Sequence, residues 1–155
     1  MQYLMAKYPT PQSFTPTNPS KYVGNLATLT LRSSWERKLA IYCDTHPKVK
    51  RWGCETLVIP YISSIDGSRH RYFVDFILEV EDVHGKLKKV AIEVKPKCQT
   101  QAPTPPKRKT QKAEARYLRE THEWIRNQDK WKAARAFCSE RGITFVIMTE
   151  AELDI

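Results

Sequence analysis

The feature of this chain that most constrains its fold is a pair of apolar stretches joined by a short polar segment, FVDFILEVEDVHGKLKKVAIEVKPK, residues 73–97. Successive residues of a β-strand face opposite sides, so alternation separates an apolar row from a row that carries acids and a lysine. The segment Val83-His84-Gly85, with Gly85 in the left-handed conformation, is a common three-residue hairpin loop. The sequence therefore predicts an antiparallel hairpin with one buried face.

The position of the loop also predicts which residues of the hairpin lie opposite each other. With the hairpin centred on His84, Asp75 and Glu93 lie equally far along the two strands and therefore face each other. Opposed side chains in antiparallel strands have Cβ atoms about 4.5–5.5 Å apart, close enough for two carboxylates to bind one hard cation. Lys95 follows on the same face. A two-residue loop would place the two acids on opposite faces of the sheet. The observed register therefore tests the prediction that Asp75 and Glu93 face each other.

The apolar row of the first strand is expected to point to the other side of the sheet. We expect it to contain Val74, Phe76, Leu78 and Val80. The alternative is that the polar row simply lies on a solvent-exposed face of the sheet, with Lys95 in a surface ion pair worth about 0–1 kcal/mol. Solvated rows more often carry Thr, Lys or Gln, and two adjacent carboxylates repel unless a cation such as Mg²⁺ neutralises them. The pattern therefore favours a metal site.

Composition indicates one domain and a polyanionic partner. The chain has 155 residues, of which 41% are hydrophobic, enough for a single core. Lysine and arginine total 26 against 17 acids, which gives a net charge of +9 and a pI near 9.5, and such a balance suggests nucleic acid. The four cysteines form no C-x-x-C pair and no 18-residue apolar run is present, so we expect reduced thiols in a cytosol and no membrane span.

The first part of the chain carries several prolines among Ser, Thr and Asn. Residues 1–24 are therefore expected to form an extended N-terminal arm, and residues 25–155 the folded domain. Ser33 followed by Glu36 is a capping-box pattern, which predicts a helix that begins near Ser34 and stops at Pro47. Residues 54–62 are predicted to form a strand at a sheet edge, because Pro60 cannot donate a ladder hydrogen bond.

The remaining elements complete an α/β order. Asp66-Gly67 predicts a turn before the hairpin strands, and the segment after Pro96 reads as an exposed basic loop. One or two helices are expected within residues 113–140, ended by Gly142 as the C′ residue, and then a buried strand over residues 143–149. The order is helix, three strands, helical region, strand. The right-handed crossover rule lays the last strand beside the third.

This combination resembles a known superfamily. A helix glutamate at Glu36, then Asp75, then Glu-x-Lys at residues 93–95 is similar to the restriction-endonuclease-like PD-(D/E)XK nucleases. Further blocks, such as HRYFVDF and IEVKPK, resemble the head-completion nucleases of tailed bacteriophages, over about residues 20–150. Val74 stands where the superfamily often has proline. The resemblance implies an αβββαβ core with a mixed four-stranded sheet flanked by helices, preceded here by the Pro-rich arm.

The resemblance also implies roles for individual residues. Asp75, Glu93 and the Val94 carbonyl would bind Mg²⁺, for which Mn²⁺ can substitute, and Lys95 would orient or activate the attacking water. Two roles are open for Glu36: helix capping, and a direct or water-mediated contribution to the metal site. Glu55, at the start of a predicted strand, and Glu79, on the Asp75 face, are weaker candidates, whose alternative is solvation at the strand surface.

Basic residues outside this row are candidates for contacts with DNA phosphates, against the alternative of a solvated loop. They are Arg69, Arg71, Lys97, Lys107, Arg108, Lys109 and Lys112. Binding through such contacts would weaken steeply with salt. Trp124 and Trp131, at helical spacing, are predicted to be core residues rather than base-stacking platforms.

The leading hypothesis is a Mg²⁺-dependent endonuclease that hydrolyses phosphodiester bonds of double-stranded DNA during phage head completion. Portal or neck proteins are candidate partners, and the host cytoplasm and the head–tail junction of the virion are the expected locations. Two alternatives are a structural head–tail junction protein that has kept the nuclease fold for binding DNA, and a junction-resolving or repair nuclease. Cleavage preference and oligomeric state are not predicted.

Overall fold

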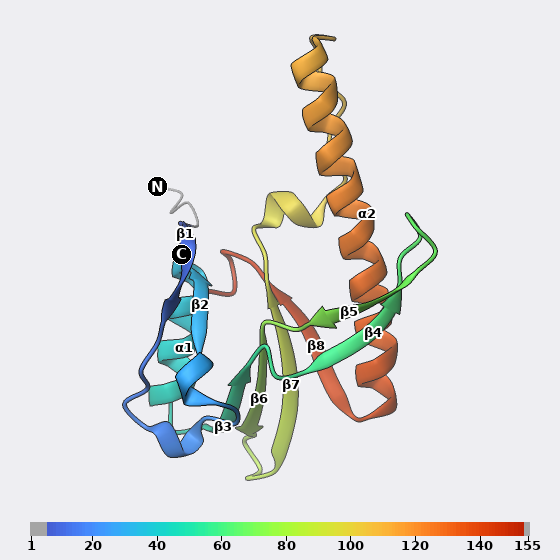
Figure 1. The fold of residues 1–155 in the computed structure, drawn as a ribbon. Helices are drawn as coiled ribbons and strands as arrows, with labels where there is room; N and C mark the ends of the chain where they lie inside the picture. The colour runs from blue at the N-terminus through green and yellow to red at the C-terminus, as the bar shows by residue number, and fades with distance from the viewer. Residues whose placement is uncertain (1–5, 154–155) are drawn as a thin grey trace.

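A mixed four-stranded sheet forms the centre of the computed structural model, which describes residues 6–153 (Figure 1). The strand order is β3-β6-β7-β8, and only β7 and β8 are parallel. The elements of this layer are α1 (Ser34–Thr45), β3 (Val49–Cys54), β6 (Phe76–Glu81), β7 (Leu87–Val94), α2 (Gln111–Glu140) and β8 (Ile143–Met148). This is the predicted αβββαβ core, and the last strand lies beside the third as expected.

The two helices cover opposite faces of the sheet and create two separate cores. On the α1 face, Trp35 and Leu39 pack with Trp52, Phe76 and Ile92. Trp52 stacks on Phe76, with ring centroids 6.1 Å apart. The apolar row predicted for the hairpin therefore lies on this face, apart from its first residue.

The second core lies on the α2 face. Trp131, Ala134 and Cys138 of α2 pack there with Ala91 of β7. Val74 is fully buried in this second core, so its predicted place beside Phe76 is wrong. The reason is that the first hairpin strand does not begin at residue 73 as predicted. Residues 74–75 are irregular, and β6 begins only at Phe76. Trp131 is a core residue as predicted, and Trp124 is half-buried.

The register of the β6–β7 hairpin is the predicted one. The ladder runs from Phe76 opposite Ile92 to Glu81 opposite Leu87, symmetric about residue 84. Gly85 adopts φ +76°, as the three-residue loop requires, and its N–H donates to the Asp82 carbonyl at 3.0 Å. The loop geometry therefore sets the pairing of the whole hairpin.

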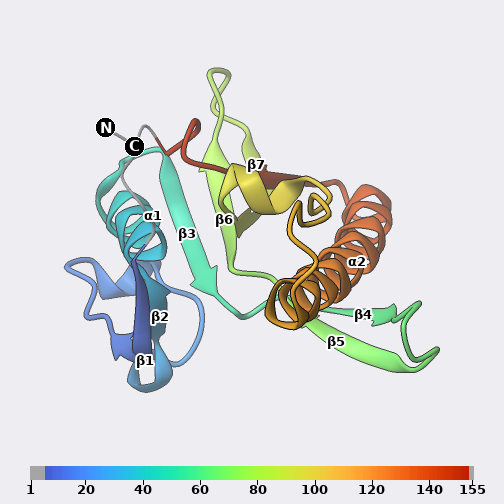
Figure 2. The ribbon, with the colours of Figure 1, turned by 90° about the horizontal axis from the view of Figure 1, so that it is seen from above.

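A second hairpin, the β4–β5 ribbon, is inserted between β3 and β6. β4 (Val58–Ile62) pairs only with β5 (Arg69–Phe73), so Pro60 lies in an edge strand as predicted. The single strand predicted over residues 54–62 is wrong, because Cys54 ends β3 and Glu55 turns the chain with φ +56°. Views along two axes show the ribbon crossing α2 (Figures 1 and 2).

The segment that begins at β1 packs against α1. β1 (Lys7–Ser13) pairs with β2 (Thr30–Ser33), and the two lie beside α1 (Figure 2). The Asp44 carboxylate accepts the backbone N–H groups of Thr17 and Asn18, each at 2.8 Å. Short 3₁₀ helices, η1 (Pro19–Lys21) and η2 (Leu26–Thr28), connect these parts. The division at residue 24 stays a prediction, and residues 1–5 of the proposed arm lie outside the described residues.

The helical region is a single 30-residue helix, α2, whose N-terminal half extends beyond the sheet (Figure 1). Gly142 follows its C-cap with φ +67°, as expected for a C′ glycine. The basic segment before α2 contains one short 3₁₀ helix, η3 (Lys97–Thr100). All four cysteines are unpaired. Within residues 6–153, no helix combines the length and apolar character that crossing a membrane needs.

The left-handed glycine of the β6–β7 loop gives a first prediction. Replacement of Gly85 by alanine should lower the free energy of unfolding by about 1 kcal/mol, because a Cβ is strained at positive φ. A Cβ there meets open space, with only a Glu81 carboxylate oxygen at 3.9 Å, so the cost is one of backbone conformation. Gly85→Asn should cost less, since asparagine tolerates this region better. Urea unfolding of both variants tests this, and equal stability of wild type and Gly85→Ala would contradict it.

Candidate active site

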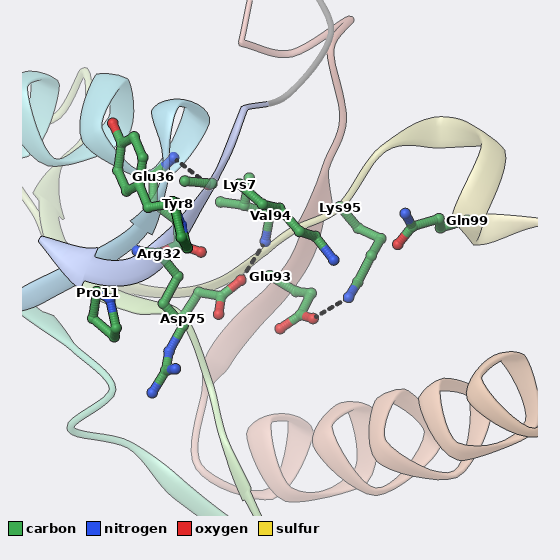
Figure 3. A pocket seen from close by; sticks show the side chains of 12 residues that line it. Lys7, Tyr8, Pro11, Arg32, Glu36, Asp75, Glu93, Val94, Lys95 and Gln99 are labelled. Atoms are coloured by element: carbon green, nitrogen blue, oxygen red, sulfur yellow. Dashed lines mark hydrogen bonds and ion pairs between the residues drawn. The ribbon is translucent and has the colours of Figure 1, made fainter. Parts of the chain in front are cut away.

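The acids and the lysine of the hairpin meet in one pocket. Asp75, Glu93 and Lys95 line a cavity of about 350 Å³, and their polar groups point toward one another (Figure 3). Its other lining residues are Lys7, Tyr8, Pro9, Pro11, Arg32, Ser33, Glu36, Val94 and Gln99. The pocket therefore draws on β7, on the residue before β6, on β1–β2, on the start of α1 and on η3.

The end of the strand ladder holds Asp75 in place. The last β6–β7 pair is Phe76 with Ile92, so Val94, two residues on, has no strand partner on that side. The Asp75 carboxylate takes this place and accepts the Val94 N–H at 2.8 Å. The backbone carbonyl of Asp75 accepts the Glu55 N–H at 3.1 Å. The interruption between β5 and β6 at residues 74–75 is thus what brings the Asp75 carboxylate onto the end of β7.

The environment of Asp75 opposes its charged form. Burial raises the pKa of this carboxyl well above its ordinary value, and the nearby carboxylates of Glu93 and Glu36 raise it further. The Val94 N–H and the Lys95 ammonium act in the opposite direction but do not offset the rise. Two neighbouring carboxylates, one buried and one half-buried, with this balance have the electrostatics of a site that gains from a bound cation.

Glu93 is held from two sides. It is 6% exposed. The Tyr72 hydroxyl donates to one of its carboxylate oxygens at 2.5 Å, and the Lys95 ammonium lies 3.5 Å from the other. Burial and the Glu93 charge raise the pKa of Tyr72, so this residue remains a hydrogen-bond donor.

Two residues near this cluster were not predicted from the sequence. Tyr72 reaches Glu93 from β5, in a region that the sequence predicted to be a loop up to residue 71. Lys130 of α2 lies with its ammonium 5.6 Å from the Tyr72 ring centroid. Burial lowers the pKa of Lys130, while the Glu93 charge opposes this. A lysine four residues before Ala134, on the apolar stripe of the helix, was the available sequence signal.

Glu36 lies in the pocket and also caps α1. Its N–H donates to the Ser33 hydroxyl at 3.2 Å, and its carboxylate accepts the Arg32 N–H at 2.9 Å. This confirms the capping role, with the reciprocal bond made to the residue before the N-cap. Burial raises the pKa of Glu36. One carboxylate oxygen is committed to the backbone, so a contribution to metal binding stays a prediction.

The two weaker acid candidates lie outside the pocket lining. Glu55 forms a turn rather than a strand start, and its carboxylate pairs with Arg32 at 3.2 Å. Glu79 lines a different depression, next to Arg51 and Lys89. The structure therefore brings neither carboxylate into the Asp75–Glu93 cluster.

None of the basic residues predicted to contact DNA lines the pocket. Arg69 and Arg71 lie on β5, and Lys97 begins η3, where its N–H donates to the Glu150 carboxylate at 3.1 Å. Lys107, Arg108 and Lys109 occupy the irregular segment before α2, and Lys112 lies in its first turn. All seven are exposed. Their role in binding stays a prediction.

The donor set suits a hard divalent cation that keeps several waters. Among residues 6–153, no three side chains of His, Cys, Asp or Glu come together as a metal-binding group. Asp75 and Glu93 supply two carboxylates, and in an extended strand the Val94 carbonyl points to the same side as its N–H, toward Asp75. Two carboxylates, a carbonyl and waters are oxygen ligands of the kind Mg²⁺ prefers.

Comparison with known proteins agrees with this geometry. Residues 46–150 match the family described as TnsA-like endonuclease N terminal, which covers β3 through β8 and both acids of the pocket. The chain belongs to the TnsA-like endonuclease family. Its fold is therefore restriction-endonuclease-like, as the sequence predicted, and nucleases of this fold generally use divalent metal ions to cut DNA.

A curated relative supports the same assignment. The chain is 41% identical over 137 residues to the head completion nuclease of Enterobacteria phage T4, covering 88% of this chain and 89% of that protein. This similarity extends the family match, since it spans most of both chains. No solved structure matches.

The Tyr72–Glu93 hydrogen bond gives a second prediction. Tyr72→Phe should lower nuclease activity and metal affinity by roughly 10–100-fold, the usual effect of removing a group that orients a metal ligand. Tyr61→Phe is the matched control, because Tyr61 is a buried tyrosine of the same ribbon that stacks on His70. Calorimetric titration with Mg²⁺ and a plasmid cleavage assay measure the two effects. Equal behaviour of both variants would show that the bond does not orient Glu93.

The raised pKa of Asp75 gives a third prediction, for protein in EDTA. A carboxyl whose pKa is higher in the folded state binds its proton more tightly there, so the free energy of unfolding falls as pH rises above the ordinary aspartate pKa of about 3.9. Asp75→Asn removes this penalty and can still accept the Val94 N–H. The variant should be more stable than wild type at pH 7, with the difference vanishing in acid. Urea unfolding across pH tests this, and a less stable variant at pH 7 would contradict it.

Proposed function

We propose that this endonuclease hydrolyses phosphodiester bonds of double-stranded DNA with Mg²⁺ held by Asp75, Glu93 and the Val94 carbonyl. The observation that carries the proposal is the buried Glu93 carboxylate and the half-buried Asp75 carboxylate in one pocket, with the Lys95 ammonium 3.5 Å from Glu93. Mn²⁺ has similar ligand preferences and is expected to substitute. A bound divalent ion would supply Lewis-acid stabilisation and lower the pKa of a coordinated water.

The residues of the chain have separate tasks in this reaction. Asp75 and Glu93 concentrate negative charge, which repels DNA until a cation is present. The Lys95 side chain is half-buried. Its compact ammonium can bind a non-bridging phosphate oxygen or hold the attacking water. Tyr72 occupies one oxygen of Glu93 and so leaves the other directed toward Lys95 and the pocket.

The charge of the protein supports duplex DNA as the substrate. The net charge of +9 attracts a polyanion. We assign phosphate contacts to the seven exposed basic residues of β5, η3, the segment before α2 and its first turn. Each such contact releases counterions, so the affinity should fall steeply with salt.

We further propose that the protein acts in phage head completion. The support is the similarity to a protein named head completion nuclease, over 88% of this chain. This role would place the protein in the host cytoplasm during assembly and at the head–tail junction of the virion, with portal or neck proteins as partners.

A cleavage assay gives the fourth prediction. The purified protein should nick or cut plasmid DNA with Mg²⁺ and stop in EDTA, and Asp75→Ala and Lys95→Ala should each reduce the rate more than about a hundredfold. Matched controls are Glu140→Ala and Lys48→Ala, on exposed residues outside the pocket. Supercoiled, linear and branched substrates should be compared.

The outcomes separate the proposed function from its alternatives. Full cleavage by Asp75→Ala would place the chemistry elsewhere. If a phage with Asp75→Ala stays infectious and a phage with Lys107→Ala and Lys109→Ala does not, the protein is a structural DNA-binding protein at the junction. A strong preference for branched DNA would indicate a junction-resolving or repair nuclease.

A further inference from the structure

The β4–β5 ribbon has an outer face that is both apolar and exposed. Strand pairing places Val58 opposite Phe73, Pro60 opposite Arg71 and Ile62 opposite Arg69, and all six side chains share one face. Ile62 is 71% exposed, Phe73 44% and Val58 37%. Exposed faces of antiparallel strands usually carry polar side chains. A row of exposed apolar side chains marks an interaction surface.

The opposite face of the ribbon is part of the second core. Ile59, Tyr61 and Tyr72 are buried there and pack in the cluster that contains Trp131 of α2. The ribbon is therefore fixed to the body of the enzyme through this inner face, and its outer face is exposed. A rigid element of this kind presents its side chains at a defined place.

The charge of the outer face is positive. Within residues 6–153, neither Arg69 nor Arg71 forms an ion pair, and the Arg71 guanidinium lies 5.4 Å from the Phe73 ring centroid. The one acid of the ribbon loop, Asp66, is paired with His70 at 2.8 Å. The face therefore combines two unpaired arginines with apolar side chains and no acid.

We infer that this outer face is a DNA-bending element that enters the minor groove beside the scissile bond. The inference rests on the proposed function. Arginine is the residue that minor-groove proteins most use to contact the groove, and apolar wedges such as Phe, Ile and Pro partly unstack base steps and kink the duplex. Arg69 and Arg71 contact the phosphates along the edge of the groove, and Ile62 and Phe73 press against the base steps.

The chain connects this face directly to the catalytic pocket. β5 ends at Phe73, and Asp75 follows after the single residue Val74. DNA held against the base of the ribbon is thus within reach of the acids. A kink at this place would move neighbouring phosphates out of their positions in the regular duplex and bring one of them to Lys95.

The features of the face favour DNA over a protein partner. A polyanion complements the two free arginines, whereas a protein that adds a strand to β4 would meet Pro60, which has no N–H to donate. The major groove of a duplex is wide enough for a two-stranded ribbon, and the narrower minor groove is wide enough for its side chains.

The experiment measures DNA bending and affinity in the full chain that carries Asp75→Asn, which prevents cleavage. A duplex labelled at both ends reports bending by energy transfer, and anisotropy reports affinity. Ile62→Ser should abolish most of the bending signal. Arg71→Ala should weaken binding about tenfold and reduce the salt dependence by about one counterion. Thermal unfolding should be unchanged, since both side chains are exposed.

Matched controls come from the end of the β6–β7 loop and the start of β7, at the far end of the sheet. Leu87→Ser, at a residue 59% exposed, and Lys86→Ala should leave bending and affinity unchanged. Ribbon variants that bend and bind DNA like their parent would overturn the inference, as would a parent that leaves DNA straight. Loss of phage assembly with normal DNA bending would assign the face to a protein partner and overturn it as well.

The proposed function is tested separately with Asp75 intact. Ile62→Ser should still cut DNA with Mg²⁺ when the protein is in excess, because the acids, Lys95 and the arginines of the ribbon are unchanged. Absence of cleavage in wild type would contradict the proposed function while leaving the bending measurement valid.

Discussion

The site depends on the antiparallel register of β6 and β7. The loop centred on His84 sets this register, and the ladder then ends where the Val94 N–H needs a partner. Asp75 supplies it at 2.8 Å, which places its carboxylate beside Glu93. A slip of one residue would turn the acids onto different faces and remove the pocket. The geometry of a short loop at one end of the sheet therefore determines the chemistry at the other.

Holding two acids together in a buried place is unfavourable for the protein alone. Burial and mutual repulsion raise the pKa of Asp75, and the surrounding residues offset this only in part. Tyr72 and Lys95 each engage Glu93, and Lys130 adds a further positive charge nearby. The same arrangement that strains the metal-free protein prepares it for a cation. Membership of the TnsA-like endonuclease family agrees with this account.

Local signals explain what could be predicted from the sequence. The Ser33–Glu36 pattern marked the start of α1, and the Gly85 loop gave the hairpin register, because both depend on contacts between residues close in the chain. The breaks at Glu55 and Val74 were missed, since a positive φ at a glutamate has no sequence signature and Val74 changes faces only to fill the core under α2.

Contacts between distant elements could not be predicted from patterns alone. The Tyr72–Glu93 bond and the position of Lys130 arise when the β4–β5 ribbon packs on α2. The pairing of β1 with β2, which brings Lys7 and Tyr8 to the pocket, likewise depends on a long-range contact. These residues nevertheless complete the surroundings of the site that the hairpin began.

The most direct measurement is the anomalous scattering of crystals grown with Mn²⁺. The account predicts a peak within coordination distance of the Asp75 and Glu93 carboxylates and the Val94 carbonyl, with Lys95 beside it. A Mn²⁺ peak at another group of residues, or well-ordered Asp75 and Glu93 side chains without a peak at saturating Mn²⁺, would contradict it.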